Sequence, residues 1–191
     1  MNIRDYNFSK TQVSAIQQDD TGYFWIAFEK NSSDVCILQK TSVNEISQLF
    51  YEIEFSVDEI VALHALGIDI YVVVDSASVF AYRISIASPV TVQTEIDIPV
   101  GVNEAPVAIV DDGTYVYILT PGSAVGENAK ICKYNGTTFV ETIDLTTVND
   151  AVGLSVDGTD IWIVTSEYPS NLVRVYELSG GIYTYAVTNL S

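Results

Sequence analysis

The pattern of apolar and polar positions repeats four times along the chain. Each copy contains an apolar run built around a large aromatic residue, and the copies are spaced about 46 residues apart. Before each of these runs lies another apolar run, in which a small residue precedes a large one. The aromatic residues are Trp25, Tyr71, Tyr117 and Trp162, and the small residues are Ala15, Ala62, Ala108 and Gly153. The small residue and the aromatic residue form two columns of the repeat, each with nearly constant spacing along the chain. Two such columns predict one structural unit in four copies.

Turn signals and further apolar runs complete each copy. Asp112-Gly113 and Asp157-Gly158 fall between the first two runs and are typical of hairpins, because glycine accepts a positive φ. A third run follows at 35–38, 79–82, 131–134 and 173–176, and a fourth at 53–55, 96–98, 143–145 and, more loosely, 185–190. No long stretch has a helical period. Four short strands per copy are therefore expected.

These elements predict an all-β fold, specifically a β-propeller of four blades with four strands each. A lone blade cannot bury both faces, so neighbouring blades must stack on it. We expect a single domain over residues 1–191, with the blades at 12–55, 59–98, 105–145 and 151–190.

An additional strand is predicted ahead of the first blade. Residues 3–8 match the fourth run of the other copies, yet no complete blade precedes them. This spare strand either closes the ring by strand exchange with the other terminus or pairs with another subunit. One chain could close a four-bladed ring, and two chains could form an eight-bladed one. Oligomerisation is the interpretation we favour.

Composition and charge narrow the class of partner. The chain is 48% hydrophobic and only 17% charged, and its 25 acidic and 8 basic residues give a net charge of −17. Such a surface repels phosphate backbones and anionic lipids, so neither nucleic acid nor membrane is expected as a partner. The first ten residues lack the apolar core of a signal peptide, so synthesis in the cytoplasm is expected. This expectation is compatible with later incorporation of the protein in a virion.

Acidic residues before the first strands of the blades form the one candidate metal site. Asp58, Glu59, Glu104 and Asp150 would lie on one face of the propeller, where oxygen ligands could hold calcium. The simpler interpretation is a solvated acidic rim, and no other cofactor is expected. For contacts with partners, the irregular loops containing Pro121, Glu127, Tyr168 and Pro169 are the better candidates.

The residues that usually carry catalysis do not form a recognisable set. His64 is the only histidine and has no equivalent in the other copies, so a packed histidine is expected. The alignment of the third runs places Cys36 and Cys132 in one column, which predicts packing between blades rather than a disulfide. The shared aromatic column likewise predicts packing between blades. We therefore expect no enzymatic activity.

Two short segments resemble known propeller families. The segment QQDDTGYFWIAF, residues 17–28, resembles the blade motif of two-component-regulator propellers, in which Asp and Gly precede Trp. The segment DGTDIWIVT, residues 157–165, is similar to the blades of NHL- and YVTN-type propellers. These resemblances cover the first hairpin of a blade and imply the architecture, with no particular ligand or chemistry.

The combined expectation is a non-enzymatic structural or interaction protein that binds protein partners or itself. A phage virion or tail component, acting as a scaffold or adhesion module, is the role we favour. Two alternatives stay open: a lectin-like propeller that binds glycans, and an enzyme with an acidic site on the axis.

Overall fold

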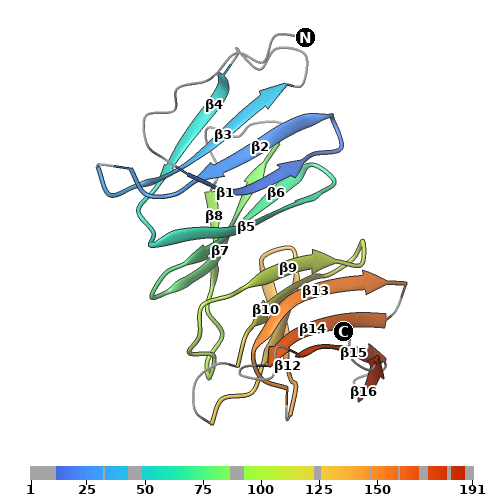
Figure 1. The fold of residues 1–191 in the computed structure, drawn as a ribbon. Helices are drawn as coiled ribbons and strands as arrows, with labels where there is room; N and C mark the ends of the chain where they lie inside the picture. Colours follow the sequence, from blue (N-terminus) through green and yellow to red (C-terminus); the bar gives the residue numbers. More distant parts are fainter. Residues whose placement is uncertain are drawn as a thin grey trace.

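The protein is described by a computed structural model over residues 12–31, 33–42, 49–86, 93–122, 126–146, 148–158, 160–167, 172–179 and 182–187. Every regular element in these ranges is a β-strand (Figure 1). The same ranges contain no helix long and apolar enough to cross a membrane. The predicted strand at 3–8 lies outside the described residues.

The strands form four antiparallel sheets of four strands, and each sheet uses consecutive strands of the chain. Sheet 1 contains β1 (Val13–Gln18), β2 (Tyr23–Phe28), β3 (Cys36–Ser42) and β4 (Leu49–Phe55). Sheet 2 contains β5 (Glu59–Leu66), β6 (Asp69–Asp75), β7 (Val79–Ser85) and β8 (Gln93–Asp97). Sheet 3 contains β9 (Ala108–Asp111), β10 (Val116–Thr120), β11 (Lys130–Asn135) and β12 (Thr138–Asp144). Sheet 4 contains β13 (Ala151–Asp157), β14 (Asp160–Glu167), β15 (Leu172–Ser179) and β16 (Ile182–Val187).

The register of the first two strands confirms the two columns that the sequence predicts. The small residues Ala15, Ala62, Ala108 and Gly153 lie opposite Ala27, Val73, Leu119 and Val164. The aromatic residues two positions earlier in the second strands are equivalent as well. A residue of one sheet can therefore be compared directly with its equivalents in the other three.

The predicted alignment of the third strands is wrong. Leu38 pairs with Ala27, whereas Ile131 pairs with the equivalent residue Leu119, so Leu38 and Ile131 are equivalent. Cys132 then lies one position after this column and Cys36 two positions before it. The loops between the second and third strands differ in length, and this difference shifted the apparent phase. The two cysteines are free and buried, but they lie in different hydrophobic clusters.

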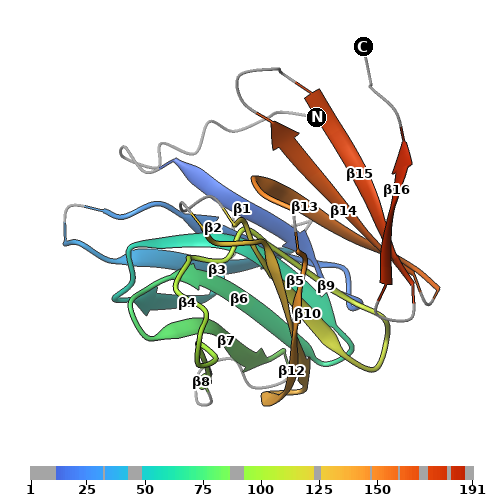
Figure 2. The same cartoon turned by 90° about the horizontal axis from the view of Figure 1, so that it is seen from below.

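The sheets follow one another in chain order through their first strands. β5 contacts both β1 and β9, and β9 also contacts β13 (Figure 1, Figure 2). Within the described ranges, β13 has no contact of that extent with β1. The four sheets therefore follow an arc, and this all-β arrangement is consistent with a β-propeller.

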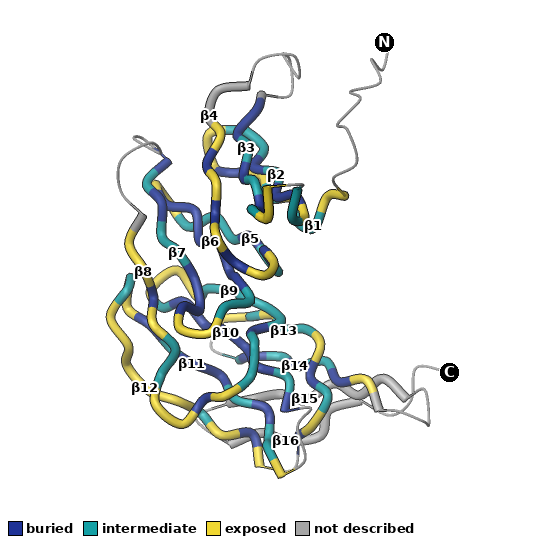
Figure 3. Tube along the Cα trace, turned by 90° about the vertical axis from the view of Figure 1, so that its left-hand side faces the viewer, coloured by how far each residue is buried: buried dark blue, intermediate teal, exposed yellow. Residues whose placement is uncertain are grey.

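The hydrophobic core lies between successive sheets rather than inside any one of them. One cluster joins sheets 1 and 2, a second joins sheets 2 and 3, and a third joins sheets 3 and 4. β6 shows the principle: Ile70 and Val72 pack toward sheet 1, while Tyr71 and Val73 pack toward sheet 3. Buried stretches occur in each of the four sheets (Figure 3). Because β6 is covered on both sides, its residues 70–74 form an unbroken apolar run.

Truncation of a residue between two sheets should be costly. Ile118 is 0% exposed between sheets 2 and 3, so Ile118→Ala should lower the free energy of unfolding by about 2–5 kcal/mol. Val140 is 45% exposed on β12, so Val140→Ala should change it by less than about 0.5 kcal/mol. Urea denaturation followed by tryptophan fluorescence measures both. Equal effects of the two substitutions would contradict a core between the sheets.

Candidate functional site

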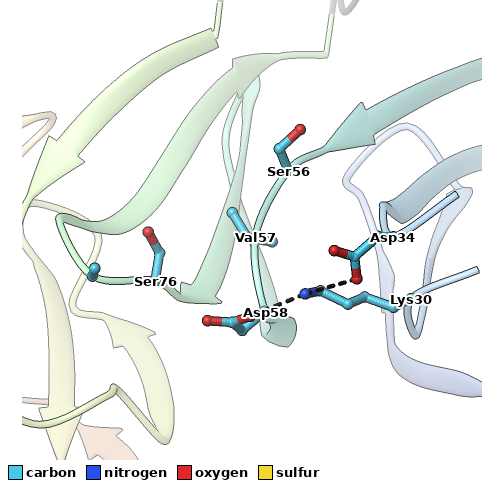
Figure 4. Close-up of a pocket in the computed structure, with 7 residues that line it drawn as sticks. Lys30, Asp34, Ser56, Val57, Asp58 and Ser76 are labelled. Carbon is cyan, nitrogen blue, oxygen red and sulfur yellow. Dashed lines mark hydrogen bonds and ion pairs between the residues drawn. The ribbon is translucent and has the colours of Figure 1, made fainter.

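A shallow hollow lies at the junction of sheets 1 and 2, where loops from both sheets meet. Lys30 follows β2, and its Nζ lies 3.1 Å from Asp34 and 3.0 Å from Asp58 (Figure 4). The hollow has a volume of about 290 Å³ and is also lined by Ser56 and Ser76. Lys30 therefore contributes a positive charge between the two carboxylates.

The same lysine pairs with Asp58, one of the four acidic residues that the sequence proposed as metal ligands. Hydrogen bonds to Asp58 and Asp34 raise the pKa of Lys30, so the ammonium stays charged. Glu59 lies beside Lys30 and Asp58 in an adjoining hollow. The described residues include no group of three or more His, Cys, Asp or Glu side chains arranged to hold a metal ion. Calcium binding stays a prediction.

The other two proposed ligands lie at different junctions. Glu104 precedes sheet 3, and its Oε2 accepts a hydrogen bond of 2.6 Å from the backbone N–H of Gly122. Asp150 precedes sheet 4, has a φ of 52°, and its carbonyl accepts a hydrogen bond from Ser166. Each candidate thus precedes or begins the first strand of a sheet, as the sequence predicted, but the four residues are spread over three sheets.

Two of the four proposed contact residues belong to the connections that brace sheet 3. The carbonyl of Pro121 accepts a hydrogen bond of 2.9 Å from Ala151 N, which ties the end of β10 to the start of β13. Glu127 forms an ion pair of 2.7 Å with Lys130. Hydrogen bonds from Lys130 and Asn103 lower the pKa of Glu127. Tyr168 and Pro169 lie outside the described residues.

The hairpin between β1 and β2 is closed by a buried carboxylate. Asp19 has a side chain with no exposed area, and it accepts hydrogen bonds from Thr21, from Tyr23 N and from the indole N–H of Trp25 at 2.8 Å. Lys40 Nζ lies 3.6 Å from Asp19 and 5.0 Å from the centre of the Trp25 ring. Burial opposes ionisation of Asp19, but the hydrogen bonds from Thr21 and Trp25 outweigh it and lower the pKa. We call this arrangement a hairpin clasp.

Related clasps occur in the next two sheets. Arg83 donates to Asp69 at 2.9 and 2.6 Å beside Tyr71. In sheet 3, the hydroxyl of Tyr117 donates to Asp112 at 2.6 Å, and Lys133 lies 5.9 Å from the Tyr117 ring. By register, Lys40, Arg83 and Lys133 lie opposite Trp25, Tyr71 and Tyr117. Three of the eight basic residues of the chain therefore occupy one structural position.

The clasps were not predicted from the sequence, although the sequence contains a signal for them. Leu38, Ala81 and Ile131 are equivalent residues of the third strands. Each of the three basic residues lies two positions after its own member of this set. The incorrect alignment of this strand hid that spacing. In sheet 4 the register places Glu177 opposite Trp162, so the column of basic residues ends at sheet 3.

The chain's single histidine links two sheets. His64 Nε2 lies 2.5 Å from Asp111 Oδ2, and this contact joins β5 to β9. Both side chains are 19% exposed. The equivalent positions hold Gln17, Val110 and Ser155, so the pair is not repeated. His64 is largely buried, as predicted, with a carboxylate as its partner.

Burial also limits the reactivity of the cysteines. It raises the pKa of Cys36, and it raises the pKa of Cys132 to about 11. Both side chains are therefore thiols near neutral pH, and the thiolate is the form that acts as a nucleophile.

Three of the four residues in the aromatic column are packed between sheets. Trp25, Tyr71 and Tyr117 are 0%, 2% and 6% exposed and belong to the three clusters of the core. The predicted packing between blades is confirmed for these three. They offer no open ring to a sugar.

Sheet 1 has an apolar face that no other sheet covers in the part of the chain that the structure describes. This face, which we call the leading face, contains Val13, Ile16, Phe24 and Ile26 and points away from sheet 2. Val13 and Ile16 are 55% and 60% exposed, whereas their equivalents Ile60 and Leu63 are 0% and 7% exposed. Phe24 and Ile26 are half-buried. Their equivalents in sheet 2, Ile70 and Val72, are fully buried against sheet 1.

Sheet 4 has a corresponding uncovered face at the other end of the arc. This trailing face contains Val152, Gly153, Trp162 and Val164 and points away from sheet 3. Val152 is 53% exposed, and Trp162 and Val164 are half-buried. The equivalents of Val164, which are Ala27, Val73 and Leu119, are all 0% exposed. Val13, Ile16 and Val164 are thus more exposed than their equivalents in the other sheets.

Comparison with known proteins supports the fold alone. No family model and no curated protein sequence matches the chain. Among solved structures, the computationally designed Ika4 protein is similar over 87% of this chain and 91% of its own, with a TM-score of 0.60 and 10% identity. BamB from Moraxella catarrhalis is similar over 91% of this chain and 52% of its own, with a TM-score of 0.58 and 12% identity.

A third similar structure is the extracellular domain of the putative hybrid two component system BT3049 from B. thetaiotaomicron. It matches 92% of this chain and 30% of its own, with a TM-score of 0.55 and 14% identity. BamB and this domain are propeller-like. The chain thus resembles β-propeller proteins, and it spans about half the length of BamB and less than a third of the BT3049 domain.

Replacement of the clasp carboxylate should destabilise the protein in a pH-dependent way. Asp19→Asn removes the charged carboxylate that accepts a hydrogen bond from Trp25 and balances buried Lys40. The substitution should lower the free energy of unfolding by about 1–3 kcal/mol at pH 7. Because the pKa of Asp19 is lowered by folding, this contribution is present above the usual Asp value of 3.8 and is lost as the pH falls through the folded value. The difference in free energy of unfolding between wild type and Asp19→Asn should therefore shrink below about pH 4.

Asp20→Asn is the matched control, since Asp20 is exposed in the same turn and should change the stability by less than about 0.5 kcal/mol. Urea denaturation between pH 3 and pH 7 provides the measurement. A difference for Asp19→Asn that is the same at every pH would contradict a stabilising carboxylate.

Proposed function

We propose that this chain is a non-enzymatic interaction β-propeller that binds protein surfaces through its leading and trailing faces. The observation that carries the proposal is the exposure of Val13 and Ile16, whose equivalents in sheet 2 are almost completely buried. Contiguous exposed apolar residues on a soluble protein mark sites of protein association. The role is that of a scaffold or structural component.

The energetics favour an occupied face. Complete burial of an Ile, Val or Phe side chain stabilises a protein by about 1.5–3 kcal/mol. The side chains of the leading face are still partly exposed, so part of this free energy is available to a partner that covers them. The leading face has four such side chains, so a partner that covered it would gain several kcal/mol before the cost of association. An uncovered face of this kind also favours aggregation, which a specific partner prevents.

The non-enzymatic part of the proposal is supported by how the reactive groups are used. His64 is held by Asp111, and both cysteines are buried thiols with raised pKa values. Lys30 is paired with two carboxylates in the hollow between sheets 1 and 2. These groups stabilise the fold or pair with one another, and protein binding is the function that the exposed surface supports.

Site-specific photocrosslinking tests the proposal. A photoreactive benzoylphenylalanine at position 16 should form covalent adducts of discrete mass with protein when the chain is irradiated in the cells that encode it. The same amino acid at position 100 is the control, because Val100 is fully exposed but lies outside both end faces. A further Ile26→Glu substitution should abolish the adducts at position 16. Absence of adducts at position 16, or equal labelling at both positions, would contradict the proposal.

A further inference from the structure

We infer that the trailing face of one chain binds the leading face of a second copy, so that two chains close one ring of eight sheets, four from each. This inference rests on the proposed function, because it names the partner of the same two faces. The ring would have two identical joints, each formed by sheet 4 of one chain and sheet 1 of the other.

The two faces are the halves of a joint that already occurs three times in each chain. Within the chain, every internal joint packs the forward face of one sheet on the backward face of the next. The trailing face is the fourth forward face: Trp162 takes the place of Trp25, and Val164 that of Ala27. The leading face is the missing backward face, since Ile16 takes the place of Leu63.

The small residues of the first strands support the same match. Ala15, Ala62 and Ala108 pack in the joints between sheets, where they allow the neighbouring first strand to approach. Gly153 holds this position in sheet 4, where a Cβ would contact only Val164, at 3.7 Å. Trailing and leading faces therefore retain the shape of an internal joint as well as its apolar character.

The arc of sheets has a direction, which determines how two copies can meet. The sheets advance in one sense from β1 through β5 and β9 to β13, so one end of the arc is always a leading face and the other a trailing face. A head-to-tail joint between two copies brings the remaining trailing and leading faces together and covers all four. In a single chain both faces stay open over the described residues, because β13 has no extensive contact with β1.

The length of the arc can be compared with that of a complete propeller-like chain. The chain matches BamB over 91% of its own residues and only 52% of that chain. For BamB, an arc of this size thus corresponds to about half of the chain, so two arcs supply its length, whereas a single arc covers 91% of the designed Ika4 chain.

Charge determines how the joint should respond to salt. The named residues of both faces are uncharged, while each chain carries a net charge of −17. Two such chains repel one another, and salt screens the repulsion while it strengthens apolar association. The dissociation constant should therefore fall as sodium chloride increases, which is opposite to the behaviour of a joint held by ion pairs.

Multi-angle light scattering of the purified full chain after gel filtration tests the inference. At micromolar concentration the wild type should have twice the single-chain mass of 20.9 kDa. Ile16→Glu and Val152→Glu should each raise the dissociation constant at least about 100-fold and give single chains, because each buries an unpaired charge in both joints. Val100→Glu, at a fully exposed site outside the faces, should leave the mass doubled. Circular dichroism melts should show all three variants folded, since each replaced side chain is exposed in one chain.

A mixture of Ile16→Glu and Val152→Glu separates a head-to-tail joint from contact between like faces. One pairing in the mixture retains an intact trailing face and an intact leading face, so two-chain particles should reappear in the mixture. Failure to recover them would overturn the head-to-tail arrangement.

The remaining outcomes are decisive as well. A wild-type mass of one chain overturns the inference, and a mass above two chains overturns the closed ring. If the wild type is a single chain and the photoreactive residue at position 16 captures a different protein, the proposed function stands and the second copy is wrong as partner. A single-chain mass without any adducts means that both are wrong.

Discussion

Burial of both faces of every sheet is the constraint on which this structure depends. β6 is apolar on each side, with Val72 packed toward sheet 1 and Val73 toward sheet 3, so neither sheet 2 nor its neighbours could be stable alone. The same requirement applies to sheets 1 and 4, each of which has extensive contact with one neighbouring sheet among the described residues. The exposed residues Ile16 and Val152 are the direct consequence. The interaction surface that we propose is therefore the part of the core that sheets 1 and 4 leave exposed.

The hairpin clasps explain how a strongly acidic chain uses its few cations. Lys40 and Arg83 lie in the third strands beside the aromatic residue of the second strand and the carboxylate of the hairpin. Lys40 Nζ also lies 3.4 Å from the carbonyl of Ile86, so this clasp reaches the next sheet. Each cation thereby neutralises a carboxylate that folding removes from water, and the remaining carboxylates are left to keep the surface soluble.

The sequence was most informative where loop length does not matter. The first two strands of each copy are joined by short turns. The residues equivalent to Trp25 and to Ala15 could therefore be predicted correctly in all four copies. The third strand follows loops of unequal length, and Cys36 and Cys132 were therefore aligned wrongly. Of the site, the sequence predicted that Asp58 and Glu59 lie at the start of the first strand of a blade. It did not predict Lys30 between the carboxylates, because that contact joins two loops far apart in the chain.

Hydrogen–deuterium exchange of β1 at two protein concentrations tests the central claim most directly, since it reports whether the leading face becomes covered. The account predicts that amides of β1 and β2 exchange more slowly as the concentration of the chain increases, and approach the protection of β5 and β6. Amides of sheets 2 and 3, whose faces are already covered, should be unaffected. Exchange in β1 that is rapid and independent of concentration would contradict the account.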